Sequence, residues 1–148
     1  MSRKPLSLLL IILGYLACGV AHEVSAEVVV IVNSAQQQEE LSGETLLRLF
    51  AMKKKFWSDG TPVTVFTLPN NNDTYKEFTN LYLKMQPHQL NRLWHRLVFS
   101  GTGVKPEVVD SMQAMLEKVA ATPGAVGYVD RLQVDLNNPS VYPVAAHE

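Results

Sequence analysis

The sequence predicts a single small α/β domain with a short, mostly parallel sheet flanked by helices. Residues 28–32 are all Val or Ile without polar alternation, which is typical of a strand covered on both faces in a parallel sheet. Residues 119–129 indicate a helix stopped by Pro123 and Gly124 and followed at once by a buried strand. Between them, apolar residues recur at helical spacing, so strand and helix patterns alternate along the chain.

Residues 1–26 have the pattern of a secretory signal peptide. Two basic residues precede an apolar run, residues 6–16, which is shorter than the about 20 residues that a membrane span needs. We expect cleavage after Ala26, which makes residues 27–148 an exported, periplasmic domain without a membrane span. The alternative is a lipoprotein signal in which Cys18 is acylated and retained.

The composition of the exported domain excludes two classes of site. Without Arg3, Lys4 and Glu23, the chain's 13 basic and 14 acidic residues become 11 and 13, a net charge of −2. This balance provides no basic footprint for nucleic acid. Cys18, the one cysteine, leaves with the signal peptide, so disulfides and thiolate metal sites are not expected.

The first half of the domain is predicted to contain a second strand after a helix. Ser42 can cap that helix, whose apolar residues share one side, and the lysines at 53–55 suit its negative end. Alternatively, these lysines form a docking edge for an acidic partner or the inner-membrane surface. A turn over residues 57–60 then leads to a strand over residues 62–68.

The second half is predicted to contain three helices before the closing strand. A cap within residues 72–74 begins the first helix, and Pro87 begins the second. The apolar residues of each helix form one stripe, as a core-facing helix requires. Residues 100–103 stop the second helix, with contact to a ligand as the alternative. Pro106 is predicted to open the third helix, with Val108 facing inward.

Three segments carry a resemblance to a known family, namely residues 46–50 (Leu-Leu-Arg-Leu-Phe), residues 57–63 (Trp-Ser-Asp-Gly-Thr-Pro-Val) and residues 119–129. In these segments the chain resembles one lobe of the type 2 periplasmic substrate-binding proteins, specifically the phosphate-binding branch that serves ABC importers. The resemblance covers residues 28–129. Proteins of this family clamp a ligand between two lobes, whereas this sequence has the length of one.

The resemblance implies an oxyanion site in the loop that connects the strand over residues 62–68 to the following helix. Backbone N–H groups and the positive end of the helix dipole meet at such a place. In the family this loop carries Arg, Asp and Ser-Gly-Thr, which fall here on Leu68, Asn70 and residues 72–74, so only the Thr is kept. The candidate ligand-binding residues are Asn70, Asn71, Asn72, Asp73 and Thr74. Without the Arg, and with an added carboxylate at Asp73, phosphate binding is expected to be weak or absent, with a dissociation constant no tighter than roughly 1 mM. The alternative for this loop is a solvated turn with a helix cap.

Motifs for catalysis and for metal binding are not found in the sequence. It has neither a serine elbow nor a Gly-rich phosphate loop, so we expect no enzymatic activity and no cofactor. His88 and His95 lie seven residues apart on one predicted helix, about 10 Å along its axis, which is too far to share a metal ion.

The sequence therefore predicts an exported binding protein. By family resemblance, its ligand is phosphate or a related small oxyanion, and it acts as an accessory to an ABC transporter or to an inner-membrane sensor. The alternative is a ligand-free protein interaction module of the bacterial envelope. The family resemblance favours the first hypothesis, and the loss of the family's Arg at Leu68 favours the second.

Overall fold

The computed structural model describes residues 27–37 and 41–144, so the predicted signal peptide, Cys18 and the cleavage site at Ala26 lie outside the described residues. The described chain forms a five-stranded sheet in the spatial order β3 (Glu107–Val108), β2 (Thr64–Thr67), β4 (Ala125–Asp130), β1 (Val28–Asn33) and β5 (Val141–Val144). β2 is parallel to β3 and to β4, and β1 is antiparallel to both β4 and β5. Four strands therefore run in one direction and β1 runs in the other.

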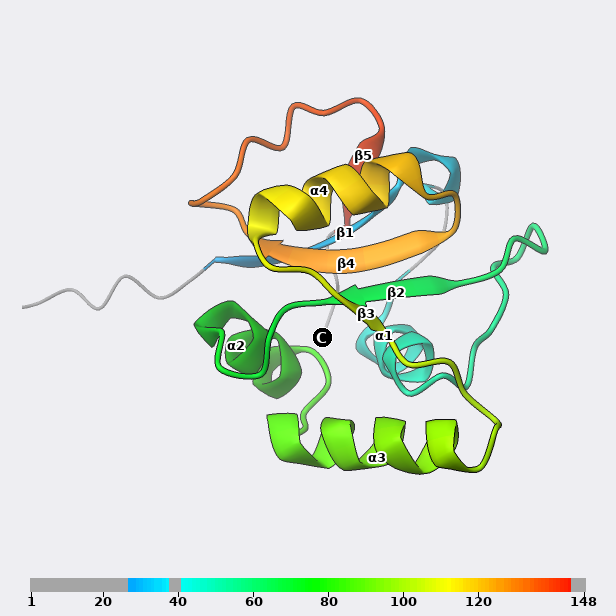
Figure 1. The fold of residues 1–148 in the computed structure, drawn as a ribbon. Coiled ribbons are helices and arrows are strands. Elements are labelled where there is room, and N and C mark those ends of the chain that lie inside the picture. Colours follow the sequence, from blue (N-terminus) through cyan, green and yellow to red (C-terminus); the bar gives the residue numbers. More distant parts are fainter. Residues whose placement is uncertain (1–26, 38–40, 145–148) are drawn as a thin grey trace, which may run out of the picture.

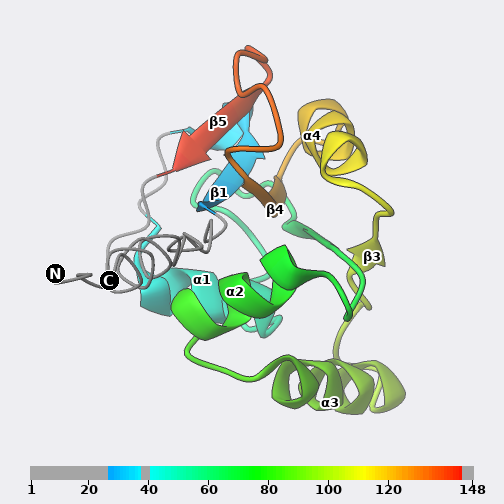
Figure 2. The ribbon, with the colours of Figure 1, turned by 90° about the vertical axis from the view of Figure 1, so that its left-hand side faces the viewer.

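Helices cover both faces of this sheet. They are α1 (Gly43–Phe50), α2 (Asp73–Leu81), α3 (Pro87–Phe99) and α4 (Met112–Ala121), with a short 3-10 turn at Ser34–Gln36. α4 lies alone on one face of the sheet, and α1 and α2 lie on the other (Figure 1). α3 packs on the outside of α2 (Figure 2). The predicted α/β class with a mostly parallel sheet is therefore confirmed. Within the described residues, every helix is too short or too polar to span a membrane.

β1 corrects one part of the sequence prediction. Its residues are almost all buried, as the unbroken apolar run at 28–32 predicted. The strand is nevertheless antiparallel to both of its neighbours. An apolar run indicates that both faces of a strand are buried under other parts of the protein. A strand can be buried in this way whether it is parallel or antiparallel to its neighbours. The inference from burial to a parallel pairing was therefore wrong for β1.

The segment after Pro106 also differs from the prediction. Glu107 and Val108 form β3 beside Phe66 and Thr67 of β2, and Val108 is 47 % exposed. The helix α4 begins only after Ser111, whose hydroxyl accepts a hydrogen bond from the Ala114 amide at 3.0 Å. A two-residue strand has no readable periodicity, so the proline was mistaken for a helix start. The predictions that Pro106 opens a helix and that Val108 faces inward were therefore wrong.

The starts of α1 and α2 and the end of α3 agree with the sequence, whereas α1 ends at Phe50, before the lysines at 53–55 where the sequence placed its end. The Ser42 hydroxyl caps α1 by accepting from the Thr45 amide at 3.2 Å, and Asn72 caps α2. The predicted stop at residues 100–103 ends α3, where Gly101 adopts a φ of 72°. Such a left-handed residue closes a helix at little cost only when it is glycine or asparagine.

The predicted stop between α4 and β4 depends on Gly124. This residue has a φ of 79°, and a Cβ atom there would collide with the carbonyl oxygen of Pro62. The Gly124 carbonyl accepts a hydrogen bond of 2.8 Å from the Trp57 indole, and its amide donates to the Gln36 side chain at 2.9 Å. The turn before β4 is therefore bonded to the hairpin formed by residues 56–62, which precedes β2.

An aromatic cluster fills the space between the sheet and the helices α1, α2 and α3. The rings of Phe78 and Tyr128 stack with centroids 4.0 Å apart, and Phe50 packs 4.7 Å from Phe78. Tyr75 lies 6.4 Å from Tyr128 and 6.5 Å from Trp94. Contacts of this kind add to the large apolar area that each ring buries. This cluster fixes α2 and α3 against the carboxyl end of β2.

Candidate functional site

The carboxyl end of β2 is held by the buried hydroxyl group of Tyr128. This hydroxyl lies 2.8 Å from the Thr67 hydroxyl and accepts a hydrogen bond of 3.0 Å from the Leu68 amide. Burial raises the pKa of Tyr128 well above its usual range, so the group stays protonated and neutral. The last residues of the strand therefore have a fixed position from which the following loop departs.

The five predicted site residues follow this strand, but they do not form one site. Asn70 and Asn71 are exposed, and the Asn72 side chain caps α2 by accepting from the Thr74 and Tyr75 amides at 2.9 and 3.3 Å. Asp73 makes an exposed ion pair of 2.7 Å with Lys76, and Thr74 is buried. Two amides at the helix start are thus already bonded within the chain. Of the five residues, Asn70 alone lines the small hollow at the end of β2.

This hollow, which we call the polar hollow, has a volume of about 100 Å³. It opens between the end of β2, the middle of α3 and the segment that leads into β3. It is lined by Thr67, Asn70, Asn91, Trp94, His95, Lys105, Pro106 and Val108. Two amides, an imidazole and an ammonium group are thus gathered around one small space, and no Asp or Glu is among its lining residues.

A partly buried hydrogen bond orients one of the amides. The Tyr75 hydroxyl donates to Asn91 Oδ1 at 3.1 Å, and burial raises the pKa of Tyr75 to about 12, which keeps this donor protonated. Because the amide oxygen accepts this bond, the NH₂ group of Asn91 remains to donate elsewhere. Trp94 is not a second donor, since its indole nitrogen bonds to the Phe50 carbonyl at 2.7 Å.

Three residues of the polar hollow, Asn91, His95 and Lys105, were not predicted as site residues from the sequence. Asn91 and His95 stand four residues apart, hence on one side of α3, and this spacing is a weak signal that could have been read. For Lys105 the sequence holds no comparable signal, because its place beside Asn70 results from the course of the chain after α3.

The side chains that line the polar hollow are of types that bind anions. Amide and imidazole N–H groups donate hydrogen bonds to oxyanions, and the ammonium group of Lys105 adds a positive charge. A metal site is not supported, since the described residues contain no group of three or more His, Cys, Asp or Glu side chains suited to a metal ion.

Neither a protein-family model nor a curated protein matches the chain. Solved structures do. A structure from Clostridium perfringens with bound phosphate, described as a substrate-binding protein of a phosphate ABC transporter, aligns over 80 % of this chain with a TM-score of 0.63 and 16 % identity. An ABC-type phosphate transport receptor from Vibrio cholerae aligns over 79 % of this chain with a TM-score of 0.60 and 19 % identity.

The chain has the fold of one lobe of a periplasmic substrate-binding protein. This confirms the fold that the sequence resemblance implied. The chain spans only 44 % of the length of each of these two structures. At such low identity the likeness establishes the fold, and the ligand has to be argued from the site itself.

Proposed function

We propose that the protein is an exported binding protein of the bacterial envelope that binds a phosphate-type oxyanion in the polar hollow. In this role it serves as an accessory to an ABC transporter or to a membrane sensor. The observation that carries the proposal is the grouping of Asn70, Asn91, His95 and Lys105 around one hollow at the carboxyl end of β2. In α/β folds, ligands bind at the carboxyl ends of strands.

The likeness to phosphate-transport proteins supports the choice of ligand. Two structures with this fold are described as phosphate-binding components of transporters, and one of them contains phosphate. A tetrahedral oxyanion offers several acceptors, which suit two amide groups, an imidazole and an ammonium converging on a small space.

The proposed binding is weak in the isolated protein. Lys105 supplies a single cation and is itself exposed, so water and salt screen its charge. The Asn72 side chain occupies two amides at the start of α2, and the carboxylate of Asp73 lowers the positive potential there. We expect a dissociation constant near 1 mM, equivalent to about −4 kcal/mol.

Titration calorimetry with inorganic phosphate tests this proposal. Replacing the cation by Lys105→Ala should weaken binding by about tenfold, the loss expected for one charge-assisted hydrogen bond. Lys53→Ala removes an exposed lysine that lines neither hollow and serves as the matched control. Equal affinity of both variants and the parent would refute the assignment of the polar hollow.

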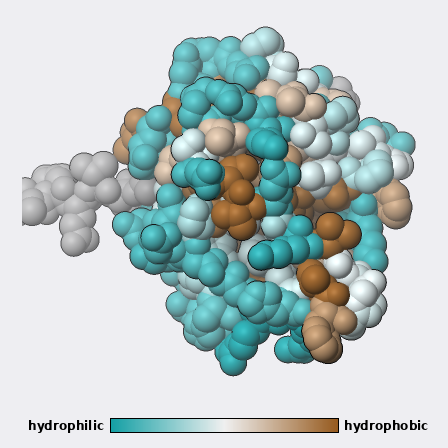
Figure 3. Space-filling model, viewed as in Figure 1, coloured by the Kyte–Doolittle hydropathy of each residue, from teal (hydrophilic) through white to brown (hydrophobic). Residues whose placement is uncertain are grey.

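A protein interaction module is the second candidate function, and one observation favours it. Phe99 at the end of α3 is 97 % exposed and Val104 is 87 % exposed. Figure 3 shows brown apolar atoms among the polar ones on the face that also carries β3. Exposed apolar side chains gathered on one side of a small protein often mark a contact surface.

The double variant Phe99→Ser, Val104→Ser separates the two functions. For an interaction module, these changes should abolish cross-linking of the exported protein to its envelope partner and leave phosphate affinity unchanged. Unchanged cross-linking would exclude this surface as the contact.

A further inference from the structure

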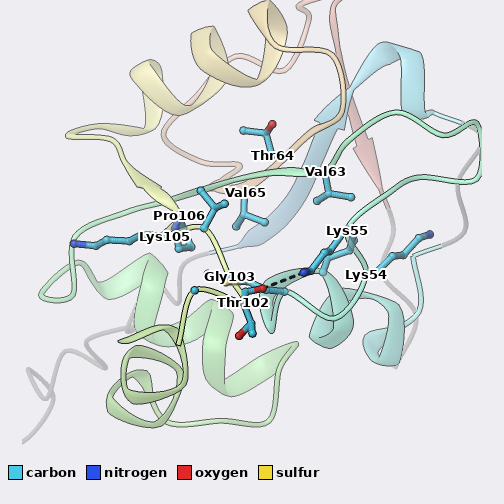
Figure 4. Close-up of a pocket in the computed structure, with 13 residues that line it drawn as sticks. Lys54, Lys55, Val63, Thr64, Val65, Thr102, Gly103, Lys105 and Pro106 are labelled. Atoms are coloured by element: carbon cyan, nitrogen blue, oxygen red, sulfur yellow. Dashed lines mark hydrogen bonds between the residues drawn. The ribbon is translucent and has the colours of Figure 1, made fainter. Parts of the chain in front are cut away.

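A larger hollow lies directly beside the polar hollow. Its volume is about 400 Å³, within the range of pockets that hold small organic molecules. We call it the apolar hollow because six of its lining residues have apolar side chains, namely Leu49, Met52, Val63, Val65, Val104 and Pro106. Figure 4 shows Val65 of β2 and Val63, which directly precedes this strand, directed into this space, while Thr64 points to the opposite side of the sheet.

The two hollows form one row along β2. Side chains alternate between the faces of a strand, so Val63, Val65 and Thr67 share a face. The first two line the apolar hollow, and Thr67 lines the polar hollow. Residues 101–106, which we call the strap, cross in front of this row, and Lys105 and Pro106 of the strap line both hollows. A ligand bound beside Lys105 therefore has an apolar space next to it.

The strap is held in place by packing and by a hydrogen bond. A Cβ atom on Gly103 would lie 2.5 Å from Met52 Sδ and 2.9 Å from Leu97 Cβ, so the backbone rests directly on these side chains. Lys55 Nζ donates to the Thr102 carbonyl at 3.0 Å, as the dashed line in Figure 4 shows. The apolar hollow is thus a formed feature with fixed walls.

Inorganic phosphate cannot use such a wall, because all of its surface is polar and strongly hydrated. An apolar group attached to the phosphate can leave water for the apolar hollow, which strengthens binding roughly fourfold for each buried methylene. The three cations that line this space, Lys54, Lys55 and Lys105, favour an anionic ligand over a neutral one.

We propose that the ligand is a small phosphate monoester with an apolar substituent, whose phosphate group occupies the polar hollow and whose substituent occupies the apolar hollow. This inference rests on the proposed function, because it takes the polar hollow as the anion site. The apolar hollow has room for a small organic group but not for the two long acyl chains of a phospholipid, so we assign the ligand to a soluble ester.

Calorimetry of the exported protein with phenyl phosphate and with inorganic phosphate tests the inference. Phenyl phosphate should bind at least about tenfold more tightly, the effect of burying an aromatic ring in part. Equal affinities would overturn the inference and leave the proposed function standing. Absence of binding by either compound would instead refute the proposed function itself.

A matched pair of variants locates the substituent. Val65→Thr keeps the shape of the side chain and adds a hydroxyl to the apolar wall. It should weaken the binding of phenyl phosphate by about threefold or more and leave the affinity for inorganic phosphate unchanged. Val144→Thr makes the same change in β5, away from both hollows, and should alter neither affinity. A Val65→Thr variant with full phenyl phosphate affinity would overturn the assignment. A vesicle experiment tests the choice of a soluble ester. If the protein sediments with phosphatidic acid vesicles and phenyl phosphate does not release it, that choice is overturned.

Discussion

Truncation of Trp94 should destabilise the protein strongly, because this side chain connects α3 to the core beside the polar hollow. Trp94 is 5 % exposed and its ring lies 6.5 Å from that of Tyr75. Its indole nitrogen donates at 2.7 Å to the carbonyl of Phe50, the last residue of α1, where carbonyl groups have no partner within the helix. Trp94→Ala removes both the packing and this hydrogen bond, and we expect a loss of about 3 to 5 kcal/mol in the free energy of unfolding.

Equilibrium urea denaturation measures this loss, with Trp94→Phe as the comparison. The phenylalanine keeps much of the ring's packing but leaves the Phe50 carbonyl without its donor, which costs about 1 to 3 kcal/mol. Trp94→Phe should therefore be clearly more stable than Trp94→Ala. A loss below about 1 kcal/mol for Trp94→Ala would contradict the buried position of Trp94 and the account of α3 that depends on it.

Three further predictions follow from particular contacts. Gly124→Ala should cost about 2 to 5 kcal/mol in urea denaturation, because it combines a positive φ with a collision at Pro62, and an unchanged midpoint would refute this reading of the turn. The pKa of Tyr75 is raised to about 12 from 10.0, so its contribution to stability is complete below pH 10 and is lost as the pH rises through about 12, which thermal unfolding across this range would detect. Intact-mass measurement of the exported protein should give an amino terminus directly after Ala26, whereas a lipid-bearing terminus at Cys18 would contradict it.

The parts of the fold that the sequence predicted are those with a local physical cause. Ser42 caps α1 through its own hydroxyl, and Gly124 takes a backbone angle that other residues rarely adopt. In each case the residue type and its neighbours in the chain are sufficient to determine the local structure.

The parts that were missed depend on partners distant in the sequence. β3 is defined by its pairing with Phe66 and Thr67, and β5 by its pairing with β1 through residues that include a proline, which weakens any strand pattern. The site has the same character. Asn70 was predicted from its place after a strand, but His95 and Lys105 reach it only through the packing of α3 and the course of the strap.

Whether the polar hollow binds an oxyanion is tested most directly by titrating the exported protein with phosphate. NMR spectroscopy of the backbone and side-chain N–H groups monitors the titration. We expect chemical-shift changes that saturate with a dissociation constant near 1 mM and that centre on Asn70, Asn91, His95 and Lys105. Shifts confined to the lysines at 53–55, or an absence of shifts up to tens of millimolar phosphate, would contradict the assignment of the polar hollow as an oxyanion site.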